Sequence, residues 1–284
     1  MSKNIRKTKT RASKGLLAAL FSCSAIIGYG TYDALVDYNI EEAQEYSAHI
    51  DTPDLNCLST IRQELKGDQY INNDHHDVLV IPGFFTNDAY MSRLHTNLSE
   101  AGFSPHNWGG GILGLNSADD ATQLEHRLID IYENNEQQKI SIVGYSLGGV
   151  HARALAIKHP DKVRTVITLS SPLGLKDDFG NLDARVQEVY NSYDVKAEKM
   201  GLDPIDVPVT AFSSTTDRIV SWKHSVIGSS DNAENGLLTS GHITIPFRKE
   251  TSQYIAERFS TSSNNWQTQR QKYCLPPKRP SPNT

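Results

Sequence analysis

The sequence has few residues of the kinds that build metal sites and disulfide scaffolds. It holds three cysteines, Cys23, Cys57 and Cys274, and none lies in a C-x-x-C pair or in a clustered His/Cys spacing typical of a bound metal. A phosphate-binding loop is also lacking, because the glycine-rich stretch at 109–116 (GGGILGLN) does not match G-x-x-x-x-G-K-[ST]. The sequence therefore predicts no metal and no other cofactor.

Cys57 and Cys274 lie on either side of the central part of the chain. In an oxidising compartment they could form a disulfide that ties the C-terminal tail to the N-terminal segment. Because the sequence gives no distance between them, two unpaired thiols are an equally open interpretation.

Positive charge is scarce in most of the chain. Six of the 28 Lys and Arg residues lie in the first 14 positions, which leaves 22 against 33 acidic residues and a net charge of −11 for the remainder. Nucleic-acid binding needs a basic face, so this balance argues against a nucleic-acid partner.

The basic start is followed by residues 15–32 (GLLAALFSCSAIIGYGTY), a run of 18 residues without a charge. A basic segment before an apolar one is typical of an export signal. The run only just reaches the length of a membrane-spanning helix, so an uncleaved anchor, which we favour, competes with a cleaved signal peptide or a lipoprotein signal ending at Cys23. Positive-inside topology places the acidic body in the cell envelope, outside the cytoplasm, exported or anchored to the inner membrane.

Apolar, β-branched runs alternate with amphipathic segments in the central part of the chain. The expected strands are 77–81, 102–108, 140–143, 163–169, 207–213 and 237–239, and the expected helices are 87–100, 118–134, 150–158 and 248–259. Strands that alternate with helices predict an α/β fold with a doubly wound, mostly parallel sheet.

This pattern divides the chain into four parts. The first two are the signal or anchor segment at 1–32 and a helical segment with a linker at 33–76. A catalytic domain at 77–260 and a flexible C-terminal tail at 261–284 follow. Residues 174–206 interrupt the alternation within the domain, and we expect them to form a small helical cap insert.

The segment 139–150 (KISIVGYSLGGV) places a serine between a strand and a helix. Gly144 to Gly148 match G-x-S-x-G, the nucleophile-elbow motif, and this context is the one that the motif requires. Small residues two positions before and after the serine let a strained turn close, and the helix N-terminus directs free N–H groups towards the site. We therefore predict that Ser146 is a catalytic nucleophile.

A serine nucleophile needs an imidazole to take its proton and a carboxylate to orient the imidazole. In the chain order Ser, acid, His, Asp217 follows the fifth predicted strand and His242 the sixth. His224 is a rival base, but it lies only seven residues beyond Asp217. His151, in the helix after Ser146, is interpreted as a helix-face residue near the site.

An oxyanion hole needs two backbone donors. One should be the N–H of Leu147, directly after the nucleophile. The other should come from the loop after the first strand, Pro82-Gly83-Phe84, where we expect the N–H of Phe84 to donate. A simple strand-ending turn is the alternative interpretation of that loop.

These motifs together resemble the α/β-hydrolase superfamily, and within it the bacterial lipase/esterase-like branch. The segments that carry the resemblance are IPGFFTND, IVGYSLGGVHARALAIKHPDKVRTVITLSSP, TAFSSTTDRIVSW and SGHITI, within about residues 77–260. The resemblance implies a serine hydrolase of carboxylic esters with Ser146, Asp217 and His242 as the triad. Phe84 and Leu147 correspond to the oxyanion donors, although Pro82-Gly83 replaces the common His-Gly pair.

The implied substrate is a small-molecule or lipid ester, with the acyl length and the leaving group left open. Two other functions also stay open. An acyltransferase would use the same acyl-enzyme, and a membrane-tethered binding protein would keep the fold without turnover.

Overall fold

The computed structural model describes residues 76–174, 183–196, 205–214, 216–228, 232–238 and 240–260. The predicted signal or anchor at 1–32, the segment 33–75, the tail at 261–284, and therefore Cys57 and Cys274, lie outside these residues. Parts of the predicted cap insert lie outside them as well. Within the described ranges, no helix combines the length and the apolar character needed to cross a membrane.

Six parallel strands form one sheet in the order β2-β1-β3-β4-β5-β6. The strands are β1 (Asp77–Ile81), β2 (Ser104–Asn107), β3 (Ile140–Tyr145), β4 (Val163–Leu169), β5 (Val209–Ser214) and β6 (Ala233–Leu238). The chain runs from β1 to the edge strand β2 and returns to β3 on the other side of β1. The strand order therefore reverses between β1 and β3, the kind of position at which open α/β sheets bind ligands.

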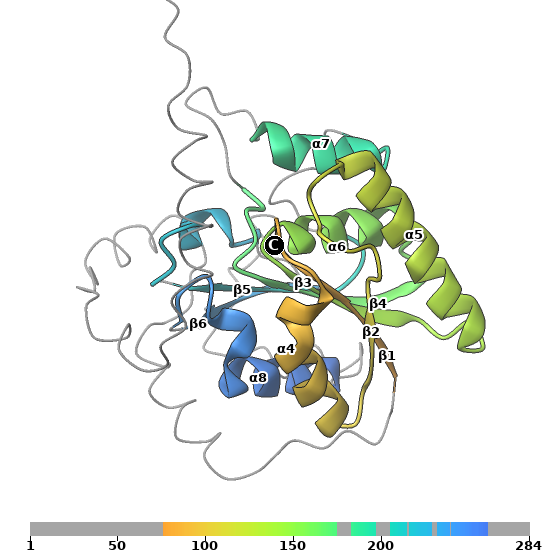
Figure 1. Cartoon of the computed structure of the whole chain (residues 1–284), viewed down its shortest axis with the longest axis horizontal. Helices are drawn as coiled ribbons and strands as arrows, with labels where there is room; N and C mark the ends of the chain where they lie inside the picture. Colours follow the sequence, from red (N-terminus) through yellow and green to blue (C-terminus); the bar gives the residue numbers. More distant parts are fainter. Residues whose placement is uncertain are drawn as a thin grey trace, which may run out of the picture. The chain divides into compact units, whose positions relative to one another are not determined.

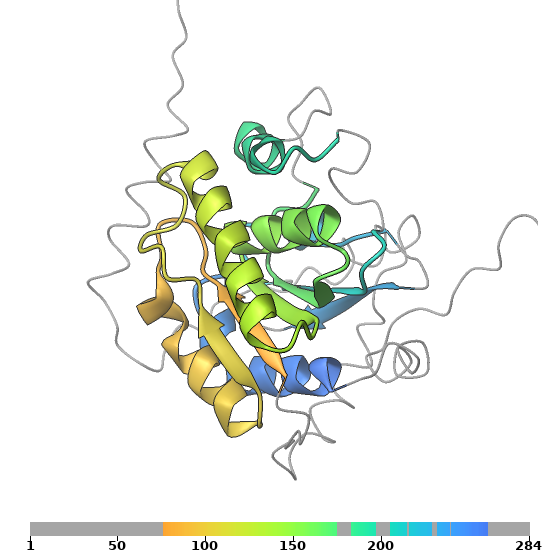
Figure 2. The ribbon, with the colours of Figure 1, turned by 90° about the vertical axis from the view of Figure 1, so that its right-hand side faces the viewer.

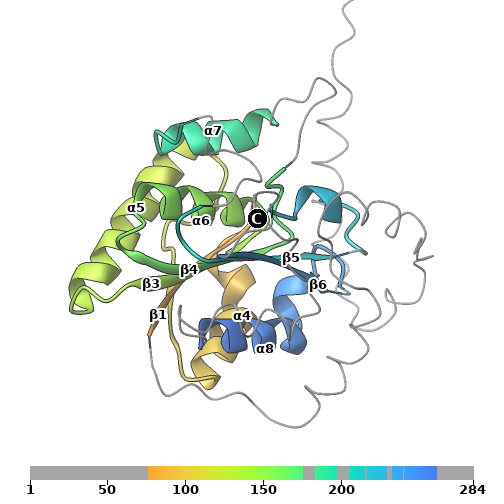
Figure 3. The same ribbon diagram turned by 180° about the vertical axis from the view of Figure 1, so that it is seen from behind.

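Helices cover both faces of this sheet (Figures 1 and 2). One face carries α5 (Ser117–Asn134), α6 (Leu147–Lys158) and α7 (Ala184–Ser192), and the other carries α4 (Asp88–Glu100) and α8 (Lys249–Phe259). The view from behind in Figure 3 shows the same two layers of helices on opposite sides of the strands. The described part is thus an α/β/α sandwich, as the alternation of strands and helices predicts.

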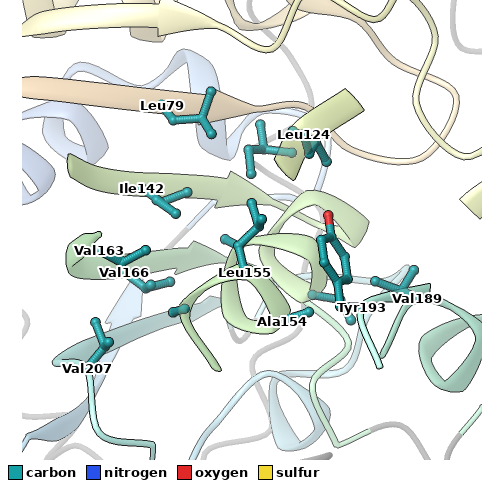
Figure 4. Close-up of a cluster of buried hydrophobic side chains, with 14 of the residues drawn as sticks. Leu79, Leu124, Ile142, Ala154, Leu155, Val163, Val166, Val189, Tyr193 and Val207 are labelled. Atoms are coloured by element: carbon teal, nitrogen blue, oxygen red, sulfur yellow. The ribbon is translucent and has the colours of Figure 1, made fainter. Parts of the chain in front are cut away.

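Strand β1 shows why the apolar runs in the sequence are continuous. Leu79 and Ile81 pack in the cluster with α5 and α6, whereas Val78 and Val80 pack in the cluster with α4 and α8. Successive side chains of a strand point to opposite faces, and both faces of this sheet are covered, so neither set can be polar. Figure 4 shows part of the first cluster, with Leu79, Leu124, Ile142, Leu155 and Val166 lying together.

The insert that interrupts the alternation contains helix α7, which packs on the outside of α5 and α6 (Figure 1). Its Val189 and Tyr190 are fully buried. The Tyr190 hydroxyl accepts a hydrogen bond from Arg153 at 3.1 Å, and the Tyr193 hydroxyl lies 3.0 Å from Nδ1 of His151. The described helix of the predicted cap is therefore docked mainly on the helical layer behind the nucleophile turn.

Candidate active site

Ser146 joins β3 to α6 in a tight turn, with φ 51° and ψ −123°. The turn closes because its neighbours are glycines. A Cβ on Gly144 would lie 2.3 Å from the carbonyl oxygen of Gly148, and a Cβ on Gly148 would lie 2.1 Å from the carbonyl oxygen of Pro82. The positions that the motif requires to be small are thus those at which backbones meet.

Ser146, His242 and Asp217 form a hydrogen-bonded row beyond the carboxyl ends of the strands. Nε2 of His242 lies 3.1 Å from Oγ of Ser146, and Nδ1 lies 2.6 Å from Oδ2 of Asp217. The other carboxylate oxygen of Asp217 accepts the N–H groups of Ile219 and Val220, at 2.8 and 2.9 Å. All three side chains are buried. In this arrangement the imidazole can take the serine proton while the carboxylate holds the ring.

The rival base His224 and the helix residue His151 have different partners. His224, in the 3₁₀ turn η4 (Trp222–His224), places Nδ1 3.2 Å from the carbonyl oxygen of Gly174. His151 is fully buried beneath α7, and burial lowers its pKa to about 3. The structure therefore brings His242, and neither His224 nor His151, into hydrogen-bond contact with the predicted nucleophile.

The loop after β1 lies directly against the nucleophile turn. A Cβ on Gly83 would lie 3.0 Å from Cβ of Ser146, so the backbone of this loop approaches as closely as a glycine allows. The N–H groups of Phe84 and Leu147 have no hydrogen-bond partner among the residues that the structure describes. Two unpaired N–H groups beside a nucleophile can bind the negative oxygen that develops in acyl transfer.

The glycine-rich loop at 109–116 supports Phe84. The N–H of Phe85 donates to the carbonyl of Leu113 at 2.9 Å, which joins the two loops. Gly114 has φ 89°, and a Cβ on it would lie 2.3 Å from the Phe84 ring. The glycine-rich loop at 109–116, which lacks a phosphate-binding pattern, therefore supports the loop after β1.

Two carboxylates that the sequence analysis did not single out hold this glycine-rich loop. Asp88 accepts the N–H groups of Trp108 and Gly109, at 3.2 and 3.1 Å, and Asp120 accepts the N–H of Gly114 at 2.7 Å. Burial raises the pKa of both carboxyl groups above their ordinary value. Each lies in the first turn of a helix, where an acidic residue also favours the helix dipole, so the sequence offered only that ambiguous signal.

Helix α7 reaches the site loops through Arg185. Its guanidinium lies 4.0 Å from the centroid of the Phe84 ring, in a cation–π contact. The insert therefore touches the loop after β1.

The match to a family model agrees with this architecture. Residues 116–199 match the family model described as alpha/beta hydrolase fold, whereas no curated protein gives a significant match. Similar solved structures include a lipase-esterase related protein from Clostridium acetobutylicum ATCC 824, with 16% identity, 66% of this chain and 95% of that chain covered, and a TM-score of 0.46. The monoacylglycerol lipase of Paleococcus ferrophilus has 17% identity, 67% and 96% coverage and a TM-score of 0.49. An esterase from Exiguobacterium antarcticum has 13% identity, 67% and 94% coverage and a TM-score of 0.49.

Proposed function

We propose that this chain is a serine hydrolase of the α/β-hydrolase superfamily that cleaves carboxylic esters. The observation that carries the proposal is the hydrogen-bonded row from Ser146 through His242 to Asp217. A serine hydroxyl is a weak nucleophile, and this row supplies the base and the orienting carboxylate that activate it.

In the proposed reaction, Oγ of Ser146 attacks the carbonyl carbon of the ester while Nε2 of His242 takes the hydroxyl proton. The N–H groups of Phe84 and Leu147 bind the resulting oxyanion. When the intermediate collapses, the C–O bond to the alcohol breaks, and the alcohol leaves with the proton from His242. A water molecule, deprotonated by the same imidazole, then hydrolyses the acyl-enzyme and releases the carboxylic acid. Asp217 holds the ring throughout.

A fluorophosphonate probe tests this proposal without knowledge of the substrate, because it reacts with an activated serine. We expect the wild-type protein to be labelled and Ser146→Ala to be unlabelled. An unlabelled wild type, or equal labelling of Ser146→Ala, contradicts the proposal. Product analysis of a cleaved ester with and without an added alcohol then distinguishes hydrolysis from acyl transfer.

The surface around the site favours esters with an apolar group. All six large apolar side chains that are exposed in the described part of the chain follow the carboxyl ends of strands; this apolar rim consists of Phe85, Ile112, Leu115, Ile219, Ile243 and Phe247. Phe85 follows the proposed oxyanion donor Phe84, and Ile243 follows His242. Exposed apolar groups on the sheet edge that carries the nucleophile can bind an apolar partner, and we propose that the rim binds the hydrocarbon part of the substrate.

Esters of p-nitrophenol with graded acyl chains test the role of the rim. Leu115 is 66% exposed, so Leu115→Ser should leave the fold intact. We expect it to raise KM for long acyl chains by about threefold to tenfold, because burial of each CH₂ is worth about 0.8 kcal/mol. The acetyl ester is the control, since it has the least apolar surface to bury. An equal change in KM for the acetyl and long-chain esters contradicts the proposed apolar specificity.

A further inference from the structure

Tyr145 occupies the second position of the G-x-S-x-G motif, at the end of β3, and is 3% exposed. Its chain neighbour is Ser146. Its hydroxyl donates a hydrogen bond to the backbone carbonyl of His242 at 3.1 Å, across 97 residues of sequence. A single residue is thus bonded along the chain to the proposed nucleophile and through its side chain to the proposed base.

The ring of Tyr145 also lies between two parts of the site. Its centroid is 5.2 Å from that of the His242 imidazole. A Cβ on Gly83 would lie 2.8 Å from Cδ1 of Tyr145, so the loop after β1 packs on the same ring. A displacement of this ring would therefore displace both the base and the oxyanion loop.

A second tyrosine makes the same kind of contact with the residue that follows His242. Tyr90, on α4, donates its hydroxyl proton to the carbonyl of Ile243 at 2.7 Å. Its ring is stacked on that of Tyr145, with centroids 5.7 Å apart and an interplanar angle of 18°. Two consecutive carbonyls of the loop that carries His242 are thus held by two stacked tyrosines.

The start of this loop is held from a third side. The hydroxyl of Ser214, at the end of β5, donates to the carbonyl of Ser240 and accepts its N–H at 3.1 Å. The loop is therefore tied to α4, β3 and β5 by three hydroxyl groups. Such ties matter because His242 lies in a turn outside the helices and strands, so its backbone has no regular ladder of hydrogen bonds.

Both tyrosines can act as donors over the whole working pH range. Burial raises the pKa of Tyr145 well above its ordinary value and that of Tyr90 to about 12. The hydroxyl groups therefore keep their protons, and the two contacts with the loop do not switch with pH.

We propose that Tyr145, assisted by Tyr90, is a positioning residue that sets the distance between Oγ of Ser146 and Nε2 of His242. Its hydroxyl acts through the backbone of the base, and its ring packs beside the imidazole. This inference rests on the proposed function, since the distance matters only if a proton passes between the two side chains. Small displacements of reacting groups have large effects on rate, because proton transfer requires hydrogen-bond contact.

The rate of labelling by a fluorophosphonate tests the inference, because it measures activation of Ser146 independently of any substrate. Tyr145→Phe keeps the ring and removes the hydroxyl. The matched control is Tyr193→Phe, which also removes a buried hydroxyl, but one that contacts His151 beneath α7. We expect Tyr145→Phe to slow labelling about tenfold or more, and Tyr193→Phe to stay within about twofold of wild type. Equal rates for the two variants overturn the inference.

Two further measurements separate positioning from a loss of stability. Tyr90→Phe alters a half-buried side chain, and we expect it to slow labelling several-fold, less than Tyr145→Phe does. The downfield proton resonance of the hydrogen bond between His242 and Asp217 should broaden in Tyr145→Phe and persist in Tyr193→Phe. Labelling at the wild-type rate in both Tyr145→Phe and Tyr90→Phe overturns the positioning role alone, whereas an unlabelled wild type overturns the proposed function itself.

Discussion

Ser146 has a backbone conformation that L-amino acids seldom adopt, with φ 51°. Such a conformation costs about 1–3 kcal/mol and persists only where the surroundings impose it. Its N–H donates to the carbonyl of Leu169 on β4 at 2.8 Å, and its carbonyl accepts the N–H of Gly149 at 3.0 Å. The strained residue is thus held by the sheet on one side and by the first turn of α6 on the other.

The glycines of this turn give the first prediction. In Gly148→Ala the new methyl group would meet the carbonyl oxygens of Pro82 and Ile81, at 2.1 and 2.6 Å, and neither backbone can yield easily. We expect a loss of about 1–3 kcal/mol of stability and a large loss of fluorophosphonate labelling, because the oxyanion loop must move.

Chemical denaturation and labelling of the same preparations check this outcome. Gly241→Ala is the control, since the atom nearest to its new Cβ would be 3.6 Å away, an ordinary contact. Wild-type stability and labelling in Gly148→Ala would show that the elbow has more room than its atoms indicate.

Asp217 gives a second prediction at this scale. Asp217→Asn keeps an oxygen that can accept the N–H groups of Ile219 and Val220, so the loop should stay folded. The amide cannot hold the imidazole in the required tautomer and charge state, and we expect kcat to fall about 10³–10⁴-fold. Steady-state kinetics on a p-nitrophenyl ester measure the change in kcat. A fall of less than about tenfold would assign Asp217 a structural role only.

At the scale of elements, β6 is the strand that its own sequence supports least. Of its six residues the sequence predicted only the last two as strand, because Glu234 and Asn235 are poor strand formers. Glu234 accepts from Thr210 at 2.6 Å and pairs with Arg258 of α8 at 2.5 Å, while the Asn235 side chain bonds both the N–H and the carbonyl of Ile227. Partners from other elements thus bind polar groups that would otherwise disfavour a buried strand.

The pair between Glu234 and Arg258 predicts how strongly α8 is tied to β6. Both side chains are fully buried. Arg258→Met leaves the carboxylate buried without its cation, and we expect a loss of about 3–5 kcal/mol in urea unfolding. The double variant Arg258→Met with Glu234→Gln should recover part of this loss, because it also removes the negative charge of the buried carboxylate. If the free energy of unfolding of Arg258→Met lies within about 1 kcal/mol of wild type, water or another group compensates the carboxylate.

At the scale of the whole molecule, two buried histidines make stability depend on pH. Burial lowers the pKa of His151 to about 3, and burial together with the nearby guanidinium of Arg164 lowers that of His76 to about 3. The unfolded chain titrates both imidazoles near their ordinary value of 6.5. Below that pH the unfolded chain binds protons that the folded protein does not, so the free energy of unfolding falls as pH falls from about 6.5 towards 3.

We expect each of these histidines to add about 1.4 kcal/mol per pH unit to the slope in that window, and nothing above it. Urea unfolding at pH 7, 6 and 5 measures the slope. We expect His151→Gln to be less stable than wild type at pH 7, and its free energy of unfolding to change less with pH. His126→Gln, on the exposed face of α5, is the control for the loss of a histidine. Parallel slopes in wild type and His151→Gln would contradict the low pKa.

The sequence by itself determined the α/β class, the positions of five of the six strands and the elbow around Ser146. These features have local causes. Strands buried on both faces must be continuously apolar, and a strained turn must have small neighbours. The chain order of the family then pointed to Asp217 and His242 among several candidates, and the structure brings both to Ser146.

The tertiary structure alone decided which residues hold that row in place. Tyr145 contacts His242 across 97 residues, and Tyr90 contacts Ile243 across 153. Such contacts have no period or spacing in the sequence, because they arise when separate elements pack on one another. A tyrosine in a helix or at a strand end looks the same whether it fills the core or holds a loop, and only the position of its hydroxyl group separates the two roles.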